Sequence, residues 1–368
     1  MTILALVAAL SLHTQSIDWR PLAHIVDSAI AAGAAPGGVV AVSVRGVRYI
    51  HGAGRLGVDD PATPDSKTLY DLASLTKVVG LTTGMMLAVS EGKIDLDAPV
   101  QRYVPAFAGA GKEAVTIRHL LTHSSGLPGH RRLWELATDR AGAIALVNST
   151  PLDTVPGVRM IYSDLGAMVL TEALESAYGV RLDSLLAARV FQPLEMSSTQ
   201  FLPPASLLPR IAPTERDPWR GRVLRGEVHD ENAARLGGIS GHAGLFSDAE
   251  DLIRFGEWLL ADDKAPVPIS AAIAREFLRK QELPPGSSRA LGWDTPSENS
   301  SAGTRFSSQS FGHTGFTGTS IWMDPTRGVV LVLLTNRVNP SRDNNRHVAL
   351  RRAVADETIG IIDAYENR

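Results

Sequence analysis

The sequence contains no cysteine among its 368 residues. This absence excludes disulfides, thiolate nucleophiles and most structural zinc sites, because all three depend on cysteine sulfur. It does not identify the redox compartment, since proteins without disulfides occur in every compartment. Any nucleophile in this chain must therefore be a hydroxyl, an amine or a carboxylate.

An excess of one charge and long hydrophobic runs are also missing. The formal net charge is -3, and no run of lysines and arginines forms the basic stripe that nucleic acids require. Beyond the N-terminus, no stretch reaches the roughly 18 uncharged apolar residues of a membrane span. We therefore expect no nucleic-acid partner and no integral membrane span.

The N-terminus contains a short apolar run, Ile3 to Leu12, followed by the small residues Thr14 and Ser16. A run of about ten apolar residues is too short to cross a bilayer, and its position is typical of a secretory signal peptide. No lysine or arginine precedes the run, so an uncleaved or misassigned start is the alternative. We expect residues 1–16 to be a signal peptide and the protein to be periplasmic or secreted.

Strand patterns occupy both ends of the chain, and helical patterns lie between them. The valine-rich stretch from Val39 to Ile50 predicts a hairpin, and apolar runs on either side of the turn at 324–328 predict two further strands. The helical patterns cover Leu75–Ser90, Ile117–Thr122, Asp139–Asn148, Leu165–Ser176, Leu182–Val190, Ala249–Leu260 and Asn345–Tyr365. We therefore predict an α+β fold, in which both chain ends build one antiparallel sheet that is flanked by helices, with a mostly helical region inserted.

No internal repeat or linker divides residues 17–368, so we expect one domain. Its sheet-forming parts are expected at about 17–65 and 265–368, and its helical region at about 70–262. One helix start has the spacing of a capping box, because Ser247 is followed three residues later by Glu250.

Two Ser-x-x-Lys motifs are present, at Ser74 to Lys77 and at Ser90 to Lys93. Ser90 lies where an apolar helix runs into Gly92, at the negative end of the helix dipole, which disfavours an oxyanion. Ser74 instead opens a helix, where residues three apart share a face and the dipole favours negative charge. Lys77 should therefore reach the Ser74 hydroxyl, although a capping serine beside a surface lysine explains this motif alone equally well.

A second candidate element is Tyr162-Ser163-Asp164, just before the helix expected near Leu165. A serine nucleophile needs a base, and a phenol, whose pKa is ordinarily near 10, becomes one at neutral pH only beside a cation. Lys77 is the obvious cation. The alternative for Tyr162 is a buried ring whose hydroxyl is hydrogen-bonded.

The third element, Phe311 to Gly318, leads into the strand expected at Ser320. Glycines beside a strand allow a substrate backbone to approach, so this edge could pair with an extended acyl group. The backbone N–H after Gly315 would then join that of Ser74 in an oxyanion hole. A glycine-rich turn without this function is the alternative.

In this order, the three elements resemble the Ser-x-x-Lys, Tyr-x-Asn and Lys-Thr-Gly motifs of the serine β-lactamase and penicillin-binding-protein superfamily. The chain is similar over most of its length to class C β-lactamases, DD-peptidases and related esterases, some of which carry His-Thr-Gly. The resemblance implies that Ser74 is the acylated nucleophile, that Lys77 and Tyr162 share the role of base, and that no cofactor or metal is needed. The residues that it assigns to substrate binding are Asp164, His313, Thr314, Gly315 and Phe316.

Two departures from these motifs concern the substrate. Asp164 stands where the pattern has asparagine, so it accepts hydrogen bonds only, and we expect it to pair with Lys77 or with an N–H or ammonium group of the substrate. His313 replaces lysine and should be mostly neutral at pH 7, which weakens the attraction for a carboxylate. We therefore expect esters or D-amino-acid peptides to be better substrates than β-lactams.

Two other patterns are candidates for the site. His119-x-x-x-His123, with His130 nearby, has a metal-ligand spacing but includes no acidic residue, so we expect a structural role. The glycine-rich run from Gly237 to Gly244, flanked by His229 and His242, is expected to be a flexible wall of the cleft or a solvated loop.

The function expected from these residues is hydrolysis through an acyl-serine intermediate. The substrates in question are D-alanyl and other D-amino-acid peptides, esters and β-lactams, as for a DD-carboxypeptidase, an esterase or a β-lactamase-like enzyme. The alternative is a catalytically weak penicillin-binding protein that binds cell-wall peptide. The partner would be a small molecule or a peptide, such as a peptidoglycan stem peptide, and a metallohydrolase is disfavoured.

Overall fold

The structure is a computed structural model that describes residues 17–367. The signal peptide predicted for residues 1–16 therefore lies outside the described residues.

Five strands form an antiparallel sheet in the order β2-β1-β10-β9-β8. They are β1 (Gly37–Val44), β2 (Val47–Gly54), β8 (Phe311–Thr314), β9 (Ser320–Asp324) and β10 (Val329–Thr335). Short pairings elsewhere join β3 (Tyr70–Asp71), β7 (Leu245–Ser247) and β4 (Gln200–Phe201), and also β5 (Arg216–Asp217) and β6 (Arg222–Val223). The prediction of an α+β fold with one antiparallel sheet from both chain ends is confirmed, and β8 lies at an edge of that sheet.

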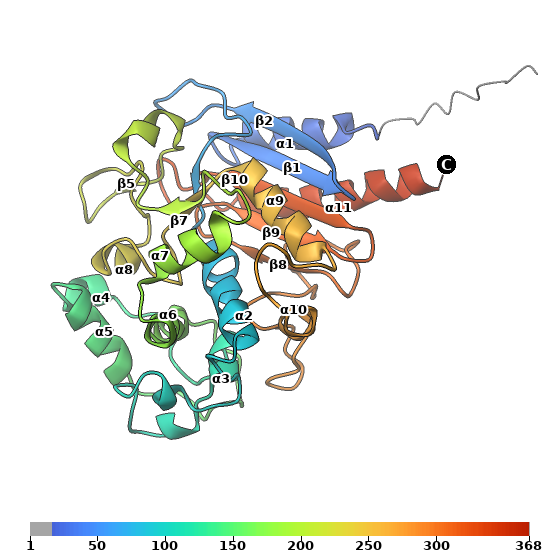
Figure 1. Cartoon of the computed structure of the whole chain (residues 1–368). Helices are drawn as coiled ribbons and strands as arrows, with labels where there is room; N and C mark the ends of the chain where they lie inside the picture. Colours follow the sequence, from blue (N-terminus) through green and yellow to red (C-terminus); the bar gives the residue numbers. More distant parts are fainter. Residues whose placement is uncertain (1–16, 368) are drawn as a thin grey trace, which may run out of the picture.

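Helices cover both faces of this sheet (Figure 1). The helices α1 (Arg20–Ala31) and α11 (His347–Glu366) pack on one face, and α9 (Ala249–Leu260) packs on the other. Successive residues of a strand point to opposite faces of the sheet. Val40 and Val42 therefore belong to the hydrophobic cluster under α1 and α11, whereas Val39 and Ala41 belong to the cluster under α9. The sheet is buried on both sides for this reason, which explains why its central strands are almost entirely apolar.

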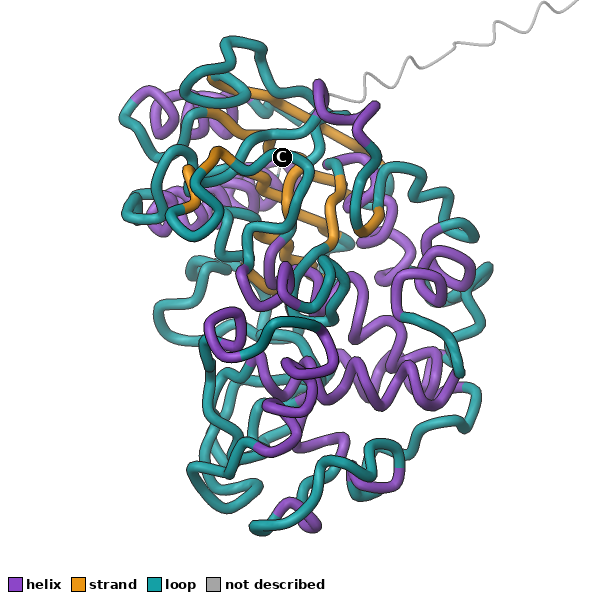
Figure 2. The backbone as a smooth tube through the Cα atoms, turned by 90° about the vertical axis from the view of Figure 1, so that its left-hand side faces the viewer, coloured by secondary structure: helices purple, strands orange, loops and turns teal. Residues whose placement is uncertain are grey.

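The inserted region is mostly helical and lies beside the sheet (Figure 2). Its α-helices are α2 (Thr83–Ser90), α3 (Ile117–Leu121), α4 (Leu133–Leu136), α5 (Arg140–Ser149), α6 (Asp164–Tyr178), α7 (Leu182–Leu186) and α8 (Glu231–Arg235), and α10 (Ala271–Leu278) follows α9. Tighter or wider helical turns are η1 (Ala73–Leu75), η2 (Lys77–Thr82), η3 (Val100–Arg102), η4 (Lys112–Ala114), η5 (Ala187–Phe191) and η6 (Ala205–Arg210).

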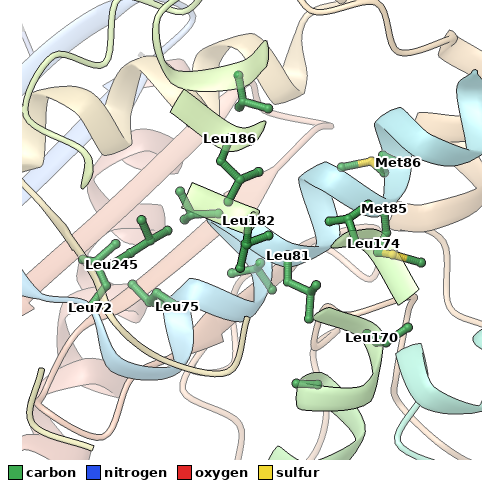
Figure 3. Close-up of a cluster of buried hydrophobic side chains, with 14 of the residues drawn as sticks. Leu72, Leu75, Leu81, Met85, Met86, Leu170, Leu174, Leu182, Leu186 and Leu245 are labelled. Carbon is green, nitrogen blue, oxygen red and sulfur yellow. The ribbon is translucent and has the colours of Figure 1, made fainter. Parts of the chain in front are cut away.

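A continuous helix from η1 through α2 runs through the core. Leucine and methionine side chains from this helix, from α6 and from α7 interlock around it, as the close-up shows (Figure 3). A Cβ at Gly84 would lie 2.7 Å from Leu174 Cδ2, so glycine permits the close approach of α2 and α6. The stretch Ala73–Ser90 is long and apolar enough to cross a membrane, but 83% of it is buried inside the protein, as in the core helix of a soluble protein.

The helix α9 begins one residue later than the capping-box prediction placed it. Its N-cap is Asp248, whose side chain accepts a hydrogen bond from the Asp251 N–H at 2.9 Å. Ser247 instead ends β7 and pairs with Tyr70, so its backbone belongs to the small sheet. The prediction that Ser247 caps this helix is therefore wrong, because the backbone of Ser247 is paired in a strand.

Candidate active site

The loop before Ser74 holds this serine at the start of the core helix. The Asp71 carboxylate accepts hydrogen bonds from the backbone N–H groups of Ala73 at 2.8 Å and of His229 at 2.6 Å. Ala73 has a φ of +47°, a left-handed conformation that is unfavourable for a residue with a Cβ. The strained bend is held by buried hydrogen bonds, as is common at functional sites, and it delivers Ser74 to the cleft.

Lys77 is buried and contacts three oxygen atoms. Its Nζ lies 3.0 Å from Ser74 Oγ, 2.7 Å from Asp164 Oδ1 and 3.0 Å from the carbonyl oxygen of His242. The expected contact with Ser74 and the expected pairing with Asp164 are thus both found. Burial acts to lower the pKa of Lys77, but the Asp164 carboxylate and the Tyr162 hydroxyl outweigh it, so this pKa is raised. Lys77 is therefore an ammonium at neutral pH.

Asp164 begins α6, directly after the N-cap Ser163, whose hydroxyl accepts a hydrogen bond from the Gly166 N–H. Burial acts to raise the pKa of Asp164, yet Lys77 and His130 lower it below its usual range. The Nδ1 of His130 lies 3.9 Å from Asp164 Oδ2, and hydrogen bonding to this carboxylate raises the pKa of His130. Asp164 is therefore a carboxylate that connects Lys77 to a histidine at the surface.

Tyr162 presents its ring to the open cleft. Its exposed fraction is 38%, which contradicts the alternative of a buried structural ring. The Lys77 Nζ lies 5.0 Å from the ring centroid, and the rings of His123 and His313 lie at 4.6 and 5.9 Å. The Ser163 N–H donates to His123 Nδ1 at 3.1 Å, and burial with nearby cations lowers the pKa of His123 well below its usual value. The histidine behind Tyr162 is therefore neutral.

His313 lies on the edge strand β8 and is 2% exposed. Its Nδ1 donates to the Thr314 carbonyl oxygen at 2.8 Å, which leaves Nε2 as an acceptor without a partner among residues 17–367. Burial first, and then the charges of Arg289 and Lys77, lower the pKa of His313 well below 6.5. His313 is neutral, in agreement with the prediction from its ordinary pKa.

The turn after β8 is tied to the loop of the serine. Gly315 donates its N–H to the Thr319 carbonyl at 2.8 Å, and a Cβ at Gly315 would lie 2.3 Å from the Leu72 carbonyl oxygen. The Thr319 hydroxyl also donates to that Leu72 oxygen, at 3.0 Å. Only glycine fits at position 315, and Phe316, which is 49% exposed, follows it at the cleft.

These elements enclose a cleft of about 500 Å³. Its lining includes Ser74, Tyr162, Arg289, Asp294, His313, Thr314, Gly315, Phe316, Arg337, His347 and Arg351. The structure thus brings together all of the residues that the three motifs supplied, with Lys77 and Asp164 just behind the surface of the cleft. It also adds three arginines that no motif indicated.

The three arginines come from three separate segments in the C-terminal third of the chain. Arg289 pairs with Asp294, and burial lowers its pKa to about 10. Arg351, on α11, donates to the carbonyls of Gly315 and Thr319 at 2.6 and 2.7 Å, and burial together with Arg337 lowers its pKa to about 9. In the sequence, the only indication of these arginines was that each lies in or beside an apolar stretch. Their convergence at one cleft cannot be seen from the sequence.

The glycine-rich run is packed into the protein, because residues 238–249 are buried, and none of its residues is among those that line the cleft. His242 contacts Asp230 through Nε2 at 2.9 Å and Ser240 through Nδ1 at 2.7 Å, while its carbonyl oxygen accepts from Lys77. The alternative of a solvated loop is therefore wrong. The sequence did not indicate that a backbone carbonyl of this run, that of His242, accepts a hydrogen bond from the Lys77 ammonium.

The histidines at helical spacing have other partners. His119 Nδ1 accepts from the Thr116 N–H at 3.2 Å and closes a capping box on α3, and His123 supports Ser163. No group of three or more histidine, aspartate or glutamate side chains is placed to hold a metal ion within the described part of the chain.

A serine hydroxyl beside a buried lysine, a tyrosine at a helix entrance and a glycine-bearing strand edge together are typical of a serine hydrolase. The chain belongs to the β-lactamase family, whose family model matches residues 22–356. The enzyme class expected from the sequence is therefore confirmed.

Two groups of known proteins are similar to the chain. Proteins of Salmonella paratyphi B and Salmonella newport, provisionally named D-alanyl-D-alanine carboxypeptidase, are 32% identical over 317 residues, which is 75% of this chain and 71% of theirs. A penicillin-binding protein homologue from Caulobacter crescentus has a TM-score of 0.73 at 21% identity, with 91% of this chain and 96% of that one covered. A class C β-lactamase from Rhodobacter sphaeroides has a TM-score of 0.72 at 20% identity, with 92% and 98% covered.

Proposed function

We propose that this serine hydrolase is a DD-carboxypeptidase, which releases the C-terminal residue of D-alanyl-D-alanine peptides through an acyl-enzyme at Ser74. The observation that carries this proposal is the charge of the cleft. Arg289, Arg337 and Arg351 are buried beside Ser74 with one carboxylate, Asp294, within ion-pair distance of them among the described residues. A buried cation without a counterion is costly, so this wall fits a substrate with a free carboxylate. The name of the Salmonella relatives supports the same substrate.

Proton transfer in this mechanism falls to Tyr162. Lys77 is an ammonium held by Asp164, so it has no free lone pair with which to take the Ser74 proton. We assign the base to the phenolate of Tyr162, with the Lys77 ammonium beside it. The Ser74 oxygen then attacks the scissile carbonyl, and the amine of the released D-alanine takes the proton from Tyr162.

The N–H groups of Ser74 and Phe316 are the donors that we assign to the oxyanion. Gly315 supports this role, because its contacts with Thr319 and Leu72 fix the backbone just before Phe316. In the second half of the cycle a water molecule attacks the acyl-enzyme while Tyr162 takes its proton; the bond between the acyl carbon and Ser74 Oγ then breaks, and Tyr162 returns the proton to Oγ.

The test is intact-mass analysis after incubation with a fluorophosphonate, a penicillin and a D-alanyl-D-alanine peptide, combined with an assay of released D-alanine. We expect the fluorophosphonate adduct and D-alanine release in the parent protein, and neither in Ser74→Ala. The matched control is Ser90→Ala in the second Ser-x-x-Lys motif, at the end of α2, which should behave like the parent. Labelling of Ser74 without D-alanine release would contradict the carboxypeptidase assignment and leave an esterase.

We further propose that the enzyme acts in the periplasm or outside the cell, where peptidoglycan stem peptides occur. The apolar run at Ile3 to Leu12 supports export. N-terminal sequencing of protein from the periplasmic fraction of its host checks this, and recovery from the cytoplasm alone would contradict it.

A further inference from the structure

Arg289 lies against the ring of the tyrosine to which the base is assigned. It comes from the segment after α10, where it forms a short antiparallel bridge with Asp294. The side chain is 4% exposed, and its Cζ lies 5.6 Å from the centroid of the Tyr162 ring. A guanidinium in this position holds a positive charge against the ring.

Two of the three guanidinium nitrogen atoms of Arg289 have no hydrogen-bond partner among the described residues. Its Nη1 pairs with Asp294, but Nε and Nη2 are buried and have no partner among residues 17–367. Burial lowers the pKa of Arg289, while the negative charge that Tyr162 can carry acts to raise it. Unsatisfied buried donors are costly, so their retention beside a reactive group indicates that the charge is used there.

The other charged and titratable groups around Tyr162 do not supply an equivalent charge. Lys77 is compensated by Asp164 at 2.7 Å. His123 and His313 both lie against the ring and are neutral, and Arg289 is the second-largest cause of their lowered pKa values. Asp164 is anionic, and the half-exposed His130 lies beyond it.

The position where the family motif has a lysine therefore carries no charge in this chain. His313 occupies that position, with its ring 5.9 Å from the ring of Tyr162. Arg289 reaches the same ring from a different segment and keeps a positive charge there. Asp294 pairs with Nη1 alone, and Nε and Nη2 of Arg289 have no partner among the described residues.

We infer that Arg289 is a positioning residue that stabilises the anionic form of Tyr162 during acylation, in place of the cation that His313 does not provide. The inference rests on the proposed function, because it requires Tyr162 to act as the base for Ser74. Removal of the cation disfavours the phenolate, so a higher pH is needed to form it. The acid limb of the kcat/KM profile should then move to higher pH.

The experiment is the pH profile of kcat/KM for a nitrophenyl ester from pH 5 to 10. For Arg289→Met we expect the acid limb to move up by about one pH unit, with kcat/KM at pH 7 about tenfold lower. Arg289→Lys keeps the charge and should shift the limb by less than half as much. Arg289→Met combined with His313→Lys returns a cation to the ring and should recover most of the loss.

Two further variants make the result decisive. Asp294→Asn removes the counterion of Arg289, so the acid limb should move to lower pH, opposite to Arg289→Met. Arg254→Met removes a partly exposed arginine on α9 that pairs with Glu195, and it should leave the profile unchanged. If Arg289→Met fails to fold, Asp294→Asn and His313→Lys in the parent still report the direction in which charge moves the limb.

An unmoved acid limb in Arg289→Met, or an equal loss at every pH without rescue by His313→Lys, would overturn the inference. Fluorophosphonate labelling and D-alanine release, measured on the same samples, separate this result from the proposed function. Labelling and ester hydrolysis without D-alanine release would remove the carboxypeptidase assignment and leave the role of Arg289 to be decided by the profile. Absence of any adduct at Ser74 would overturn both.

Discussion

The two walls of the cleft differ in how their charges are balanced. On the wall of the inserted helical region, the Lys77 ammonium faces the Asp164 carboxylate at 2.7 Å. On the opposite wall, near α11, three buried arginines face Asp294, which pairs with Arg289 alone. The charges of the first wall balance one another, whereas the second wall carries positive charge that the described residues do not neutralise.

Under the proposed function, this difference separates the two tasks of the site. A balanced ion pair fixes the protonation state of Lys77 before any substrate arrives, which suits the wall that activates Ser74. An unbalanced wall is stabilised when an anionic substrate enters, which suits recognition of a terminal carboxylate. The comparison also explains why a neutral histidine is tolerated at position 313, since arginines from other segments already provide cations.

Removal of the balanced lysine should have the largest effect. In Lys77→Met the Asp164 carboxylate loses its counterion, so we expect the free energy of unfolding to fall by about 3 kcal/mol. Ester hydrolysis should fall by about 10³-fold, the upper range for loss of a group that assists proton transfer. Urea unfolding at pH 7 and steady-state kinetics measure the two effects.

The control for this prediction is Lys77→Met combined with Asp164→Asn. The second change removes the unpaired carboxylate, so most of the lost stability should return while activity stays low. Full stability in the single variant Lys77→Met would show that the ion pair is not a structural element of this wall.

The unbalanced wall should distinguish a substrate acid from its amide. We expect kcat/KM for a D-alanyl-D-alanine peptide with a free carboxylate to exceed that for the C-terminal amide by about 10- to 100-fold, the value of one or two hydrogen bonds to a charged group. Parallel assays of D-alanine and D-alaninamide release test this in the unmodified enzyme. Equal rates for the two peptides would mean that the arginines do not recognise the carboxylate.

Neutralising the acid of the balanced wall should have the smallest effect on rate. In Asp164→Asn we expect kcat/KM for the nitrophenyl ester to fall by about tenfold, because Lys77 loses the carboxylate that holds its ammonium in place beside Ser74. Identical kinetic constants in the variant and the parent would refute a role for this pairing in the reaction.

The same variant has a definite pH signature. The pKa of Asp164 is lower in the folded protein than in the unfolded chain, where it is about 4. Its contribution to stability is therefore complete above about pH 4 and is lost as the pH falls toward the folded-state pKa. We expect Asp164→Asn to be less stable than the parent at pH 7, and the difference between the two to narrow between pH 4 and pH 2 in urea unfolding.

The motif residues were accessible from the sequence because each motif lies on one short segment. Ser74 and Lys77 are three residues apart at a helix start, so local geometry alone places their side chains together. The choice between Ser74 and Ser90 also followed from local signals, since Gly92 marks the C-terminal end of the helix that Ser74 begins. The antiparallel sheet from both chain ends was likewise readable from its apolar alternation and turn residues.

The arginines and the protonation states were not accessible in this way. Arg289, Arg337 and Arg351 belong to three segments whose convergence depends on how the chain folds over β8. Burial, which lowers the pKa of His313 and, together with ion pairing, decides the charge of Lys77, is a property of packing. The capping box at Ser247 failed for the same reason, because pairing with Tyr70 is a long-range contact.

The sequence by itself therefore determined the nucleophile candidate, its lysine, the sheet built from both chain ends and the family, because these follow from short-range spacing and periodic burial. Only the tertiary structure decided which wall of the cleft is charge-balanced and which carries positive charge that the described residues do not neutralise. The physical reason is that charge balance in a buried site depends on distances between residues hundreds of positions apart, such as Ser74 and Arg351, and on the solvent that folding removes from them.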